Sequence, residues 1–316
     1  MTVKAIPADP DEYDELAALA ENAGELGLPP AALPPVERLF VSDGEGQAMS
    51  ALVFGRADPE IVFLHGGGQN AHTWDSVVLA LGRSAVAVDL PGHGHSFTRP
   101  DRNYGPWLNA EAVAAVVAQL VHGPVALVGM SLGGATAIRL AATKPALFSS
   151  VVIVDVTPQV NDPTRSWSTS QRGTVALLAE RPTYSSFEEM ASAAIALSPR
   201  RDPVAVRRGV RHNAVPLPDG TWRWRHDLFG RRDGGSPSWQ DFTSLWEDVS
   251  NIKVPAMLVC GGESVFVAAA DAREMQRRLP ALRVERVTGA GHSVQSDQPS
   301  ELARLIESFS FGHAVF

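Results

Sequence analysis

The hydrophobic pattern of the chain alternates between short apolar runs and longer stretches with helical spacing. Apolar runs of four or five residues are typical of buried strands, whereas apolar residues three or four positions apart indicate helices. The runs lie at 61–64, 85–88, 125–128, 151–154 and 256–260, a further predicted strand with charged residues lies at 283–287, and the helical stretches lie at 74–81, 109–121, 132–142, 269–279 and 300–309. This alternation predicts an α/β protein, with a mostly parallel sheet flanked by helices on both faces.

Two further apolar runs precede this alternation. They cover residues 38–42 and 49–54, and the turn-forming sequence Asp43-Gly44-Glu45-Gly46 separates them. A short polar, glycine-containing connection between two strand-like runs is typical of a hairpin. The sheet is therefore expected to begin with an antiparallel pair of strands.

The first 35 residues predict a helical extension followed by a linker. Asp9 can cap a helix with Pro10 at its first position, and an apolar face then runs from Tyr13 to Ala23. The helix should end near Gly24, and the proline-rich stretch 28–35 reads as an extended linker. Because the apolar face of so short a helix has to pack somewhere, the extension should contact either the main domain or another subunit of a homo-oligomer.

The alternation stops after Thr157 and returns with the strand at 256–260. The intervening segment has helix fragments interrupted by prolines, and it holds five of the seven tryptophans of the chain: Trp167, Trp222, Trp224, Trp239 and Trp246. An insertion between two parts of one sheet explains this pattern. The expected organisation is an extension at 1–35, a core at 36–157 and 250–316, and an inserted cap at 158–249.

Composition places the chain among soluble globular proteins. Its 316 residues are 45% hydrophobic and 20% charged, and no apolar run is long enough to span a bilayer. The start of the chain lacks the long apolar core of a secretory signal, so a cytoplasmic location is expected. The net charge of −8 argues against a nucleic-acid partner. Cys260, the single cysteine, lies in an apolar run and is expected to be a packed thiol.

The strand at 125–128 leads directly into a helix through Gly129-Met130-Ser131-Leu132-Gly133. This G-x-S-x-G pattern is a nucleophile elbow, in which a sharp strand-to-helix turn exposes the serine hydroxyl and glycines avoid clashes on both sides. A serine is a weak nucleophile at neutral pH unless a histidine, itself held by a carboxylate, accepts its proton. Ser131 therefore requires partners elsewhere in the chain.

Candidate partners lie at the ends of other predicted strands. His292 follows the strand at 283–287 on a glycine-rich loop, at the sheet edge where open α/β sheets bind ligands. The strand at 61–64 runs into His65-Gly66-Gly67-Gly68, whose backbone N–H groups are unobstructed. An oxyanion hole needs one donor from such a loop and the N–H of the residue after the nucleophile, here Leu132. Gly67 is the first choice for the loop donor, and Gly68 is the second.

Together these pieces resemble the α/β-hydrolase family over residues 36 to 310. The matching motifs are the glycine loop 65–68, Asp89-Leu90-Pro91-Gly92-His93-Gly94-His95-Ser96, the elbow at 129–134, and Gly289-Ala290-Gly291-His292. The resemblance implies a mostly parallel sheet with an antiparallel start and a helical cap inserted after the strand at 151–154. It also implies that His65, His93 and His95 build loops rather than take part in catalysis. Neither a metal nor an organic cofactor is implied.

The catalytic acid departs from the commonest form of the family. Many members carry an aspartate just after the strand at 256–260, and Ser264 aligns with that position here. Some members place the acid at the end of the preceding strand instead and keep a serine, which matches Asp155 and Ser264. Glu263 is the competing candidate, one residue out of register. The hypothesis is a triad of Ser131, His292 and Asp155, with Ser264 as a hydrogen-bonding neighbour.

The cap is basic whereas the rest of the chain is acidic. Between residues 160 and 235 there are 12 arginines and 8 acidic residues, a net of +4 that leaves −12 for the remainder. Most of these arginines are expected to be solvated, but they could also attract an anionic substrate or dock the acidic N-terminal segment. The tryptophans either form a small core of the cap or line an apolar substrate pocket. The candidate pocket residues are Gly68, Met130, Trp167, Trp222, Trp224 and Val265.

The leading functional hypothesis is hydrolysis of a carboxylic ester or lactone of a mostly apolar or aromatic small molecule, through an acyl-enzyme. Two alternatives stay open. Members of the same family with a serine and a histidine also hydrolyse carbon–carbon bonds of ring-cleavage products. Because the usual acid after the strand at 256–260 is missing, the chain could also be a non-catalytic binding protein built on a hydrolase scaffold.

Overall fold

One eight-stranded sheet organises the protein in the computed structural model, which describes residues 13–43, 45–160, 168, 177, 183–227 and 241–312. The strands lie in the order β1-β2-β4-β3-β5-β6-β9-β10. Their bounds are Val36–Ser42 (β1), Ala48–Phe54 (β2), Ile61–Leu64 (β3), Ala85–Val88 (β4), Val125–Met130 (β5), Phe148–Val154 (β6), Ala256–Gly261 (β9) and Arg283–Val287 (β10). The pairs β1–β2 and β2–β4 are antiparallel and the other pairs are parallel. The predicted mostly parallel sheet with an antiparallel start is confirmed.

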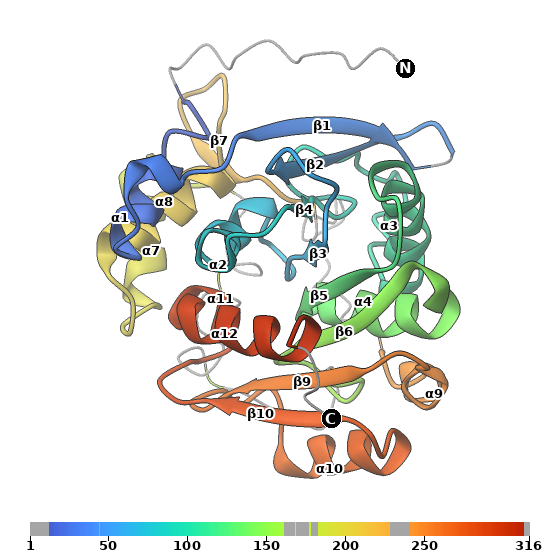
Figure 1. Ribbon diagram of the computed structural model, residues 1–316. Helices are drawn as coiled ribbons and strands as arrows, with labels where there is room; N and C mark the ends of the chain where they lie inside the picture. The colour runs from blue at the N-terminus through green and yellow to red at the C-terminus, as the bar shows by residue number, and fades with distance from the viewer. Residues whose placement is uncertain are drawn as a thin grey trace.

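Helices cover both faces of the sheet (Figure 1). On one face lie α1 (Leu19–Glu25), α2 (Asp75–Leu81), α11 (Val294–Asp297) and α12 (Pro299–Ser310), and on the other α3 (Pro106–Leu120), α4 (Leu132–Thr143), α9 (Leu245–Asn251) and α10 (Ala269–Arg278). Short 3-10 turns are η1 (Pro30–Ala32), η2 (Ala71–Trp74) and η3 (Pro145–Leu147). Each face of the sheet packs its own apolar cluster against its helices, so two hydrophobic layers enclose the sheet.

The described part of the inserted segment contains two helices and a short hairpin. These are α7 (Phe187–Ala196), α8 (Pro203–Asn213), β7 (Ala214–Pro216) and β8 (Trp222–Trp224). They share a third apolar cluster, centred on Met190, Ala194 and Val210, against which Trp222 and Trp224 pack. The two tryptophans therefore contribute to the cap's own core, one of the two roles that the sequence left open.

Helix α9 differs from the sequence prediction, which assigned residues up to 249 to the cap. Leu245 and Val249 are buried in the cluster that packs against the main sheet, and α9 contacts α4 and α10. The helix therefore lies with the core, so we place the end of the cap before Phe242, which belongs to the same cluster.

The N-terminal segment packs onto its own chain. The capping residues predicted at Asp9 and Pro10 lie outside the described residues, and the described helix begins only at Leu19. The carboxylate of Asp14 accepts the backbone N–H groups of Leu16 and Ala17, a local turn that competes with helical hydrogen bonding. Leu19 and Ala23 are buried in the cluster that also contains α2.

Acidic residues of α1 face the basic cap. Glu21 and Glu25 accept hydrogen bonds from Arg208 of α8, at 3.2 and 2.6 Å, and Figure 1 shows α1 beside α8. The basic cap thus docks the acidic segment within one chain. The extension bridges core and cap, as the charge pattern of the sequence had suggested.

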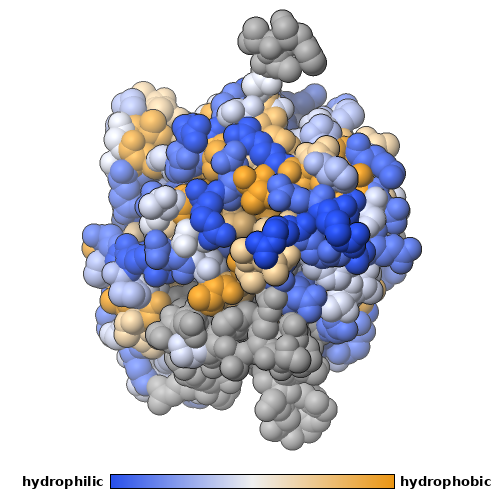
Figure 2. Space-filling model, turned by 90° about the horizontal axis from the view of Figure 1, so that it is seen from below, coloured by the Kyte–Doolittle hydropathy of each residue, from blue (hydrophilic) through white to orange (hydrophobic). Residues whose placement is uncertain are grey.

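The edge of the sheet formed by β10, opposite to β1, lies at the surface of the molecule. Figure 2 views the molecule from the side where β10 and α10 lie in Figure 1, and it shows hydrophobic side chains only in small groups between hydrophilic ones. On α10, Glu274 pairs with Arg277 and Arg278 at 2.7 and 2.6 Å. No helix in the described part of the chain is both long enough and apolar enough to cross a membrane.

Buried charges join the N-terminal segment to the core. Arg38 on β1 donates to Glu15 at 2.6 Å and to the fully buried Asp89 at 2.7 Å. Burial alone would raise the pKa of Asp89, but Arg38 and neighbouring groups hold it at about 2. His72 is also buried, which would lower its pKa, but contacts with Asp75 and Glu15 raise that pKa from 6.5 to about 9. His72 therefore carries a positive charge at neutral pH.

This charge predicts a pH dependence of stability. Between pH 6.5 and about 9 the folded protein keeps a proton on His72 that the unfolded chain has released. The stabilisation is complete below pH 6.5, and it is lost as the pH rises toward 9. We expect the free energy of unfolding, measured in urea, to fall less over this range in His72→Gln than in the unmodified chain. An equal fall in both proteins would contradict the role of His72.

Candidate active site

Ser131 lies between β5 and α4 in a backbone conformation that non-glycine residues rarely adopt. Its φ is 51° and its ψ is −117°. Strain of this kind persists only where the surroundings impose it. Here the Ser131 N–H donates to the carbonyl of Val154 at 3.0 Å, and the Ser131 carbonyl accepts the N–H of Ala135 at 2.9 Å. The residue is thus fixed by the neighbouring strand on one side and by the helix on the other.

The glycines of the elbow are required because backbones meet there. A Cβ atom on Gly129 would lie 2.2 Å from the carbonyl oxygen of Gly133, and one on Gly133 would lie 2.2 Å from that of Leu64. Both distances are far below van der Waals contact, and the atoms that would be met are backbone atoms, which cannot move aside. The G-x-S-x-G pattern therefore requires glycines at both positions, because α4 starts directly against β5 and β3.

Three candidate residues from distant parts of the chain form one hydrogen-bonded series. His292 lies on the loop between β10 and α11. Its Nε2 is 3.1 Å from Ser131 Oγ, and its Nδ1 is 2.7 Å from Asp155 Oδ2. The ring of Phe266 stacks on the imidazole with centroids 3.8 Å apart, which fixes the plane of the ring. The arrangement is the serine–histidine–carboxylate geometry that the sequence hypothesis requires.

Asp155 is fully buried at the end of β6, where its φ is also 51°. Besides His292, its carboxylate accepts the N–H of Gly261 at 2.9 Å and the hydroxyl of Ser264 at 2.5 Å. Glu263, the competing candidate, is exposed to solvent. The structure therefore brings Asp155, rather than Glu263, to the histidine, and it places Ser264 in the predicted supporting contact.

The glycine loop passes directly against the elbow. A Cβ atom on Gly66 would lie 3.2 Å from Cβ of Ser131. The N–H of Gly68 is already used, since it donates to Nε2 of His93 at 3.0 Å. The N–H groups of Gly67 and Leu132 have no acceptor among the residues that the structure describes. Of the two loop donors considered from the sequence, Gly67 is thus the one still available.

Two histidines of the family motifs support loops. Nε2 of His65 accepts the N–H of Leu90 at 2.9 Å, and Nε2 of His93 accepts that of Gly68. Burial lowers the pKa of both imidazoles, so both rings are neutral. Burial and the nearby Arg38 likewise lower the pKa of His95 to about 4. None of the three takes part in the contacts that join Ser131, His292 and Asp155.

A chain of amides, which the sequence analysis did not identify, lies behind the glycine loop. Gln69 Oε1 accepts the N–H of Gly66 at 3.0 Å, and the fully buried Gln295 donates to Gln69 at 3.4 Å and to Thr73 at 3.1 Å. Gln295 is three residues after His292, so this network connects the histidine loop to the glycine loop. The sequence signal was weak: Gln69 directly follows the glycine loop, but Gln295 lies three residues beyond its motif.

The cap also reaches the histidine loop. Asp297 on α11 accepts the N–H of Gly291 at 2.7 Å and the guanidinium of Arg201 at 2.6 Å. Among the predicted pocket residues, Met130 is buried at the end of β5 and Val265 packs against the core cluster. Trp222 and Trp224 lie in the cap cluster, and Trp167 is outside the described residues. A place in a substrate pocket remains a prediction for all of these residues and for Gly68.

Comparisons with known proteins show which family and which proteins the chain resembles. A sequence model described as Alpha/beta hydrolase family matches residues 61–305. The chain is 47% identical over 294 residues to Esterase Rv0045c of Mycobacterium tuberculosis, covering 93% of this chain and 94% of that protein. It is 27% identical over 256 residues to the sn-1-specific diacylglycerol lipase ABHD11 of Mus musculus, covering 79% and 80% of the two chains.

Solved structures show the same likeness. A structure of the Mycobacterium tuberculosis esterase, reported together with its inhibition by transition metals, superimposes with a TM-score of 0.80 at 46% identity, over 94% of this chain and 98% of that one. An E-2-(acetamidomethylene)succinate hydrolase shares the fold at 24% identity, with a TM-score of 0.72 over 87% and 99% of the chains. Because the family model spans most of the sequence and a relative at 47% identity covers nearly all of it, this chain belongs to the α/β-hydrolase family.

Proposed function

We propose that this protein is a serine esterase that cleaves a carboxylic ester or lactone of a mostly apolar small molecule through an acyl-enzyme. The observation that carries the proposal is the hydrogen-bonded series from Ser131 through His292 to Asp155, with distances of 3.1 and 2.7 Å. The likeness to a protein named an esterase, over nearly the whole chain, supports the reaction type.

The first step transfers a proton from serine to histidine. As Ser131 Oγ attacks the carbonyl carbon of the ester, His292 Nε2 accepts the hydroxyl proton. Asp155, which faces Nδ1, holds the ring in the tautomer with a free Nε2 and stabilises the imidazolium that forms. Its two other donors, the Gly261 N–H and the Ser264 hydroxyl, fix the carboxylate in this position.

The attack creates a negative oxygen on the former carbonyl. The N–H groups of Gly67 and Leu132 are the proposed donors to this oxyanion. Leu132 follows Ser131, Gly67 follows the Gly66 that lies against Ser131, and neither N–H has an acceptor among the described residues. Each such donor is worth about a hundred- to thousand-fold in rate. Collapse of the intermediate breaks the ester C–O bond, and the departing alcohol takes the proton from His292. Water then attacks the acyl-serine by the same route and releases the acid.

The substrate class is inferred from named relatives and from the sequence of the inserted segment. One relative is named an esterase and another a diacylglycerol lipase, both of which act on carboxylic esters. The family resemblance predicts a cap over the site, and the apolar substrate is inferred from the tryptophan-rich sequence of the inserted segment, although Trp222 and Trp224 belong to the cap's own core. The alternative of a binding protein rested on the missing acid after β9, and the hydrogen bond between Asp155 and His292 supports an enzyme instead.

The nucleophile is tested with a fluorophosphonate probe and a substrate panel. We expect the probe to label the chain once and to leave Ser131→Ala unlabelled. A panel of p-nitrophenyl esters of increasing acyl length, with several lactones and a vinylogous diketone, should give turnover on esters or lactones. Turnover of the diketone alone would instead indicate carbon–carbon bond hydrolysis, and an unlabelled wild-type chain would indicate a binding protein.

The acid is tested by a matched pair of substitutions. Asp155→Asn should lower kcat by about 10⁴-fold, because the amide supports the wrong tautomer of His292. Glu263→Gln should leave kcat within a factor of two, since Glu263 is exposed. Circular dichroism should show both variants folded. The reverse pattern of losses would assign the acid to Glu263.

The amide network is tested through the split between kcat and KM. Gln69→Leu removes the acceptor of the Gly66 N–H, so it should misplace the oxyanion donors and lower kcat by about 10- to 100-fold with KM little changed. Gln69→Glu, which retains an acceptor oxygen, should restore part of the loss. Gln119→Leu on the surface of α3 is the matched control. A loss of stability with unchanged kcat would limit Gln69 to a structural role.

A further inference from the structure

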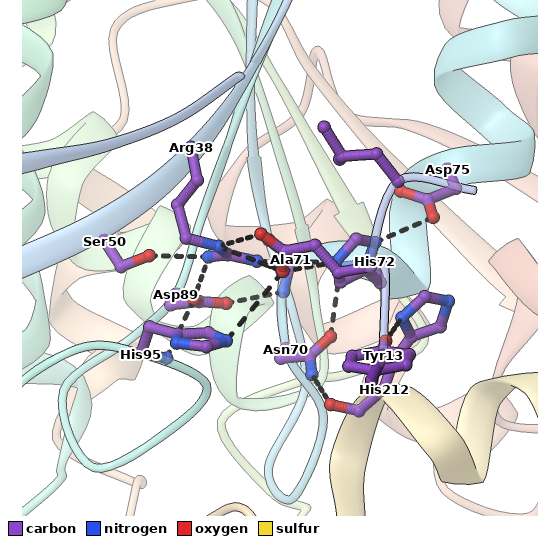
Figure 3. Close-up of polar contacts among 12 residues, drawn as sticks. Tyr13, Arg38, Ser50, Asn70, Ala71, His72, Asp75, Asp89, His95 and His212 are labelled. Carbon is purple, nitrogen blue, oxygen red and sulfur yellow. Dashed lines mark hydrogen bonds and ion pairs between the residues drawn. The ribbon is translucent and has the colours of Figure 1, made fainter. Parts of the chain in front are cut away.

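A second group of buried titratable side chains lies where core, cap and N-terminal segment meet (Figure 3). His72 lies within η2 of the core, Asp75 begins α2, and His212 lies near the end of α8 in the cap. One possible metal-ligand atom from each residue lies within 4.8 Å of the other two, and all three residues are buried. None of them belongs to the proposed catalytic machinery.

Two polar atoms of this group lack partners. His212 Nε2 and Asp75 Oδ1 are buried, and neither forms a hydrogen bond within the described part of the chain. The side chains themselves are almost fully enclosed, with 5% of His212 and 1% of Asp75 exposed. Buried polar atoms without partners are rare because they lose hydration without compensation. An electron-pair acceptor between an imidazole nitrogen and a carboxylate oxygen would satisfy both.

The opposite atoms of the same side chains are held by outer partners. His72 Nε2 is 3.1 Å from Glu15 Oε2, His212 Nδ1 contacts the hydroxyl of Tyr13, and Asp75 Oδ2 accepts the amide of Asn22 at 3.4 Å. Metal-bound histidines in proteins donate their second nitrogen to such partners, which orient the ring and raise its basicity. All three partners come from the N-terminal segment.

The local charge also accommodates a cation. The directly bonded groups include three carboxylates, those of Glu15, Asp75 and Asp89, against the guanidinium of Arg38 and the imidazole of His72. The carboxylates therefore outnumber the guanidinium, and this excess of negative groups favours a bound cation.

We propose that His72, Asp75 and His212 bind a divalent first-row transition-metal ion, such as zinc, that links the cap to the core. The ligands would be His72 Nδ1, Asp75 Oδ1 and His212 Nε2, a nitrogen- and oxygen-donor set suited to such ions. The two rings stack at 4.0 Å with 14° between their planes. Binding therefore requires one ring to rotate, so that both lone pairs point at the ion, and it replaces the contact of 2.9 Å between His72 Nδ1 and Asp75 Oδ2.

The proposal is tested with zinc alone on chelator-stripped full-length protein, by isothermal titration calorimetry and thermal unfolding. We expect one ion per chain and a rise in Tm. His212→Asn and Asp75→Asn each remove a ligand, so they should weaken binding more than Glu15→Gln. The latter removes only an outer partner and should weaken it about 10- to 100-fold. Melting of each metal-free variant establishes that it is folded.

Two control variants make the result decisive. His122→Ala removes an exposed histidine that pairs with Asp58 on the surface, and it should bind zinc as the unmodified chain does. His292→Ala should also retain the ion, because His292 is not part of this group. With cobalt in place of zinc, the visible absorption of a nitrogen-ligated ion should appear and should be lost in His212→Asn. Binding that persists in His212→Asn but disappears in His292→Ala or His122→Ala would overturn the proposal.

Discussion

The candidate site depends on a matched pair of strained residues at the ends of two neighbouring parallel strands. Met130 and Val154 are register partners on β5 and β6, so Ser131 and Asp155, which follow them, lie at the same level of the sheet. Both have a φ of 51°, and in both the backbone N–H continues the sheet, toward Val154 and Val259. The chain therefore leaves the sheet at the same level after both strands, and the side chains of Ser131 and Asp155 contact His292.

The position of the acid follows from this geometry. Because β6 lies between β5 and β9, an aspartate at its end can reach His292 and also receive the N–H of Gly261 from the end of β9. Ser264, which aligns with the more common position of the acid, has become a donor to Asp155. The carboxylate of Asp155 therefore contacts the histidine, and the hydroxyl of Ser264 supports the carboxylate from behind.

Much of this could be predicted from the sequence where the cause is local. The apolar runs specify the sheet. Any Cβ atom at Gly129 or Gly133 would clash with backbone atoms, which explains why the elbow can be recognised from its glycines in the sequence. The choice between Asp155 and Glu263 was harder to make from the sequence. Both residues follow strands, and only the folded structure shows which of the two side chains points toward His292.

Contacts between distant segments could not be derived in this way. The amphipathic N-terminal face predicted that the segment packs, but not that Leu19 would meet α2 of the same chain. His72 and His212 have no shared local pattern, and only the docking of α8 onto η2 stacks their rings. The amide series from Gln295 to Gly66 likewise crosses loops that are adjacent only in the folded protein.

The way the cap is fastened has a consequence for the site. The cap carbonyl of His212 accepts the amide of Asn70, one residue beyond the glycine loop and Gln69, and Arg201 reaches Asp297, which holds the loop of His292. Both attachments end on segments that shape the proposed oxyanion hole and the histidine. The N-terminal segment also contacts the cap, through hydrogen bonds of Glu25 with Arg208 and of Tyr13 with His212. Any movement of the described cap residues relative to the core must therefore break contacts with the segments that carry the glycine loop and His292, so the cap and the site cannot rearrange independently.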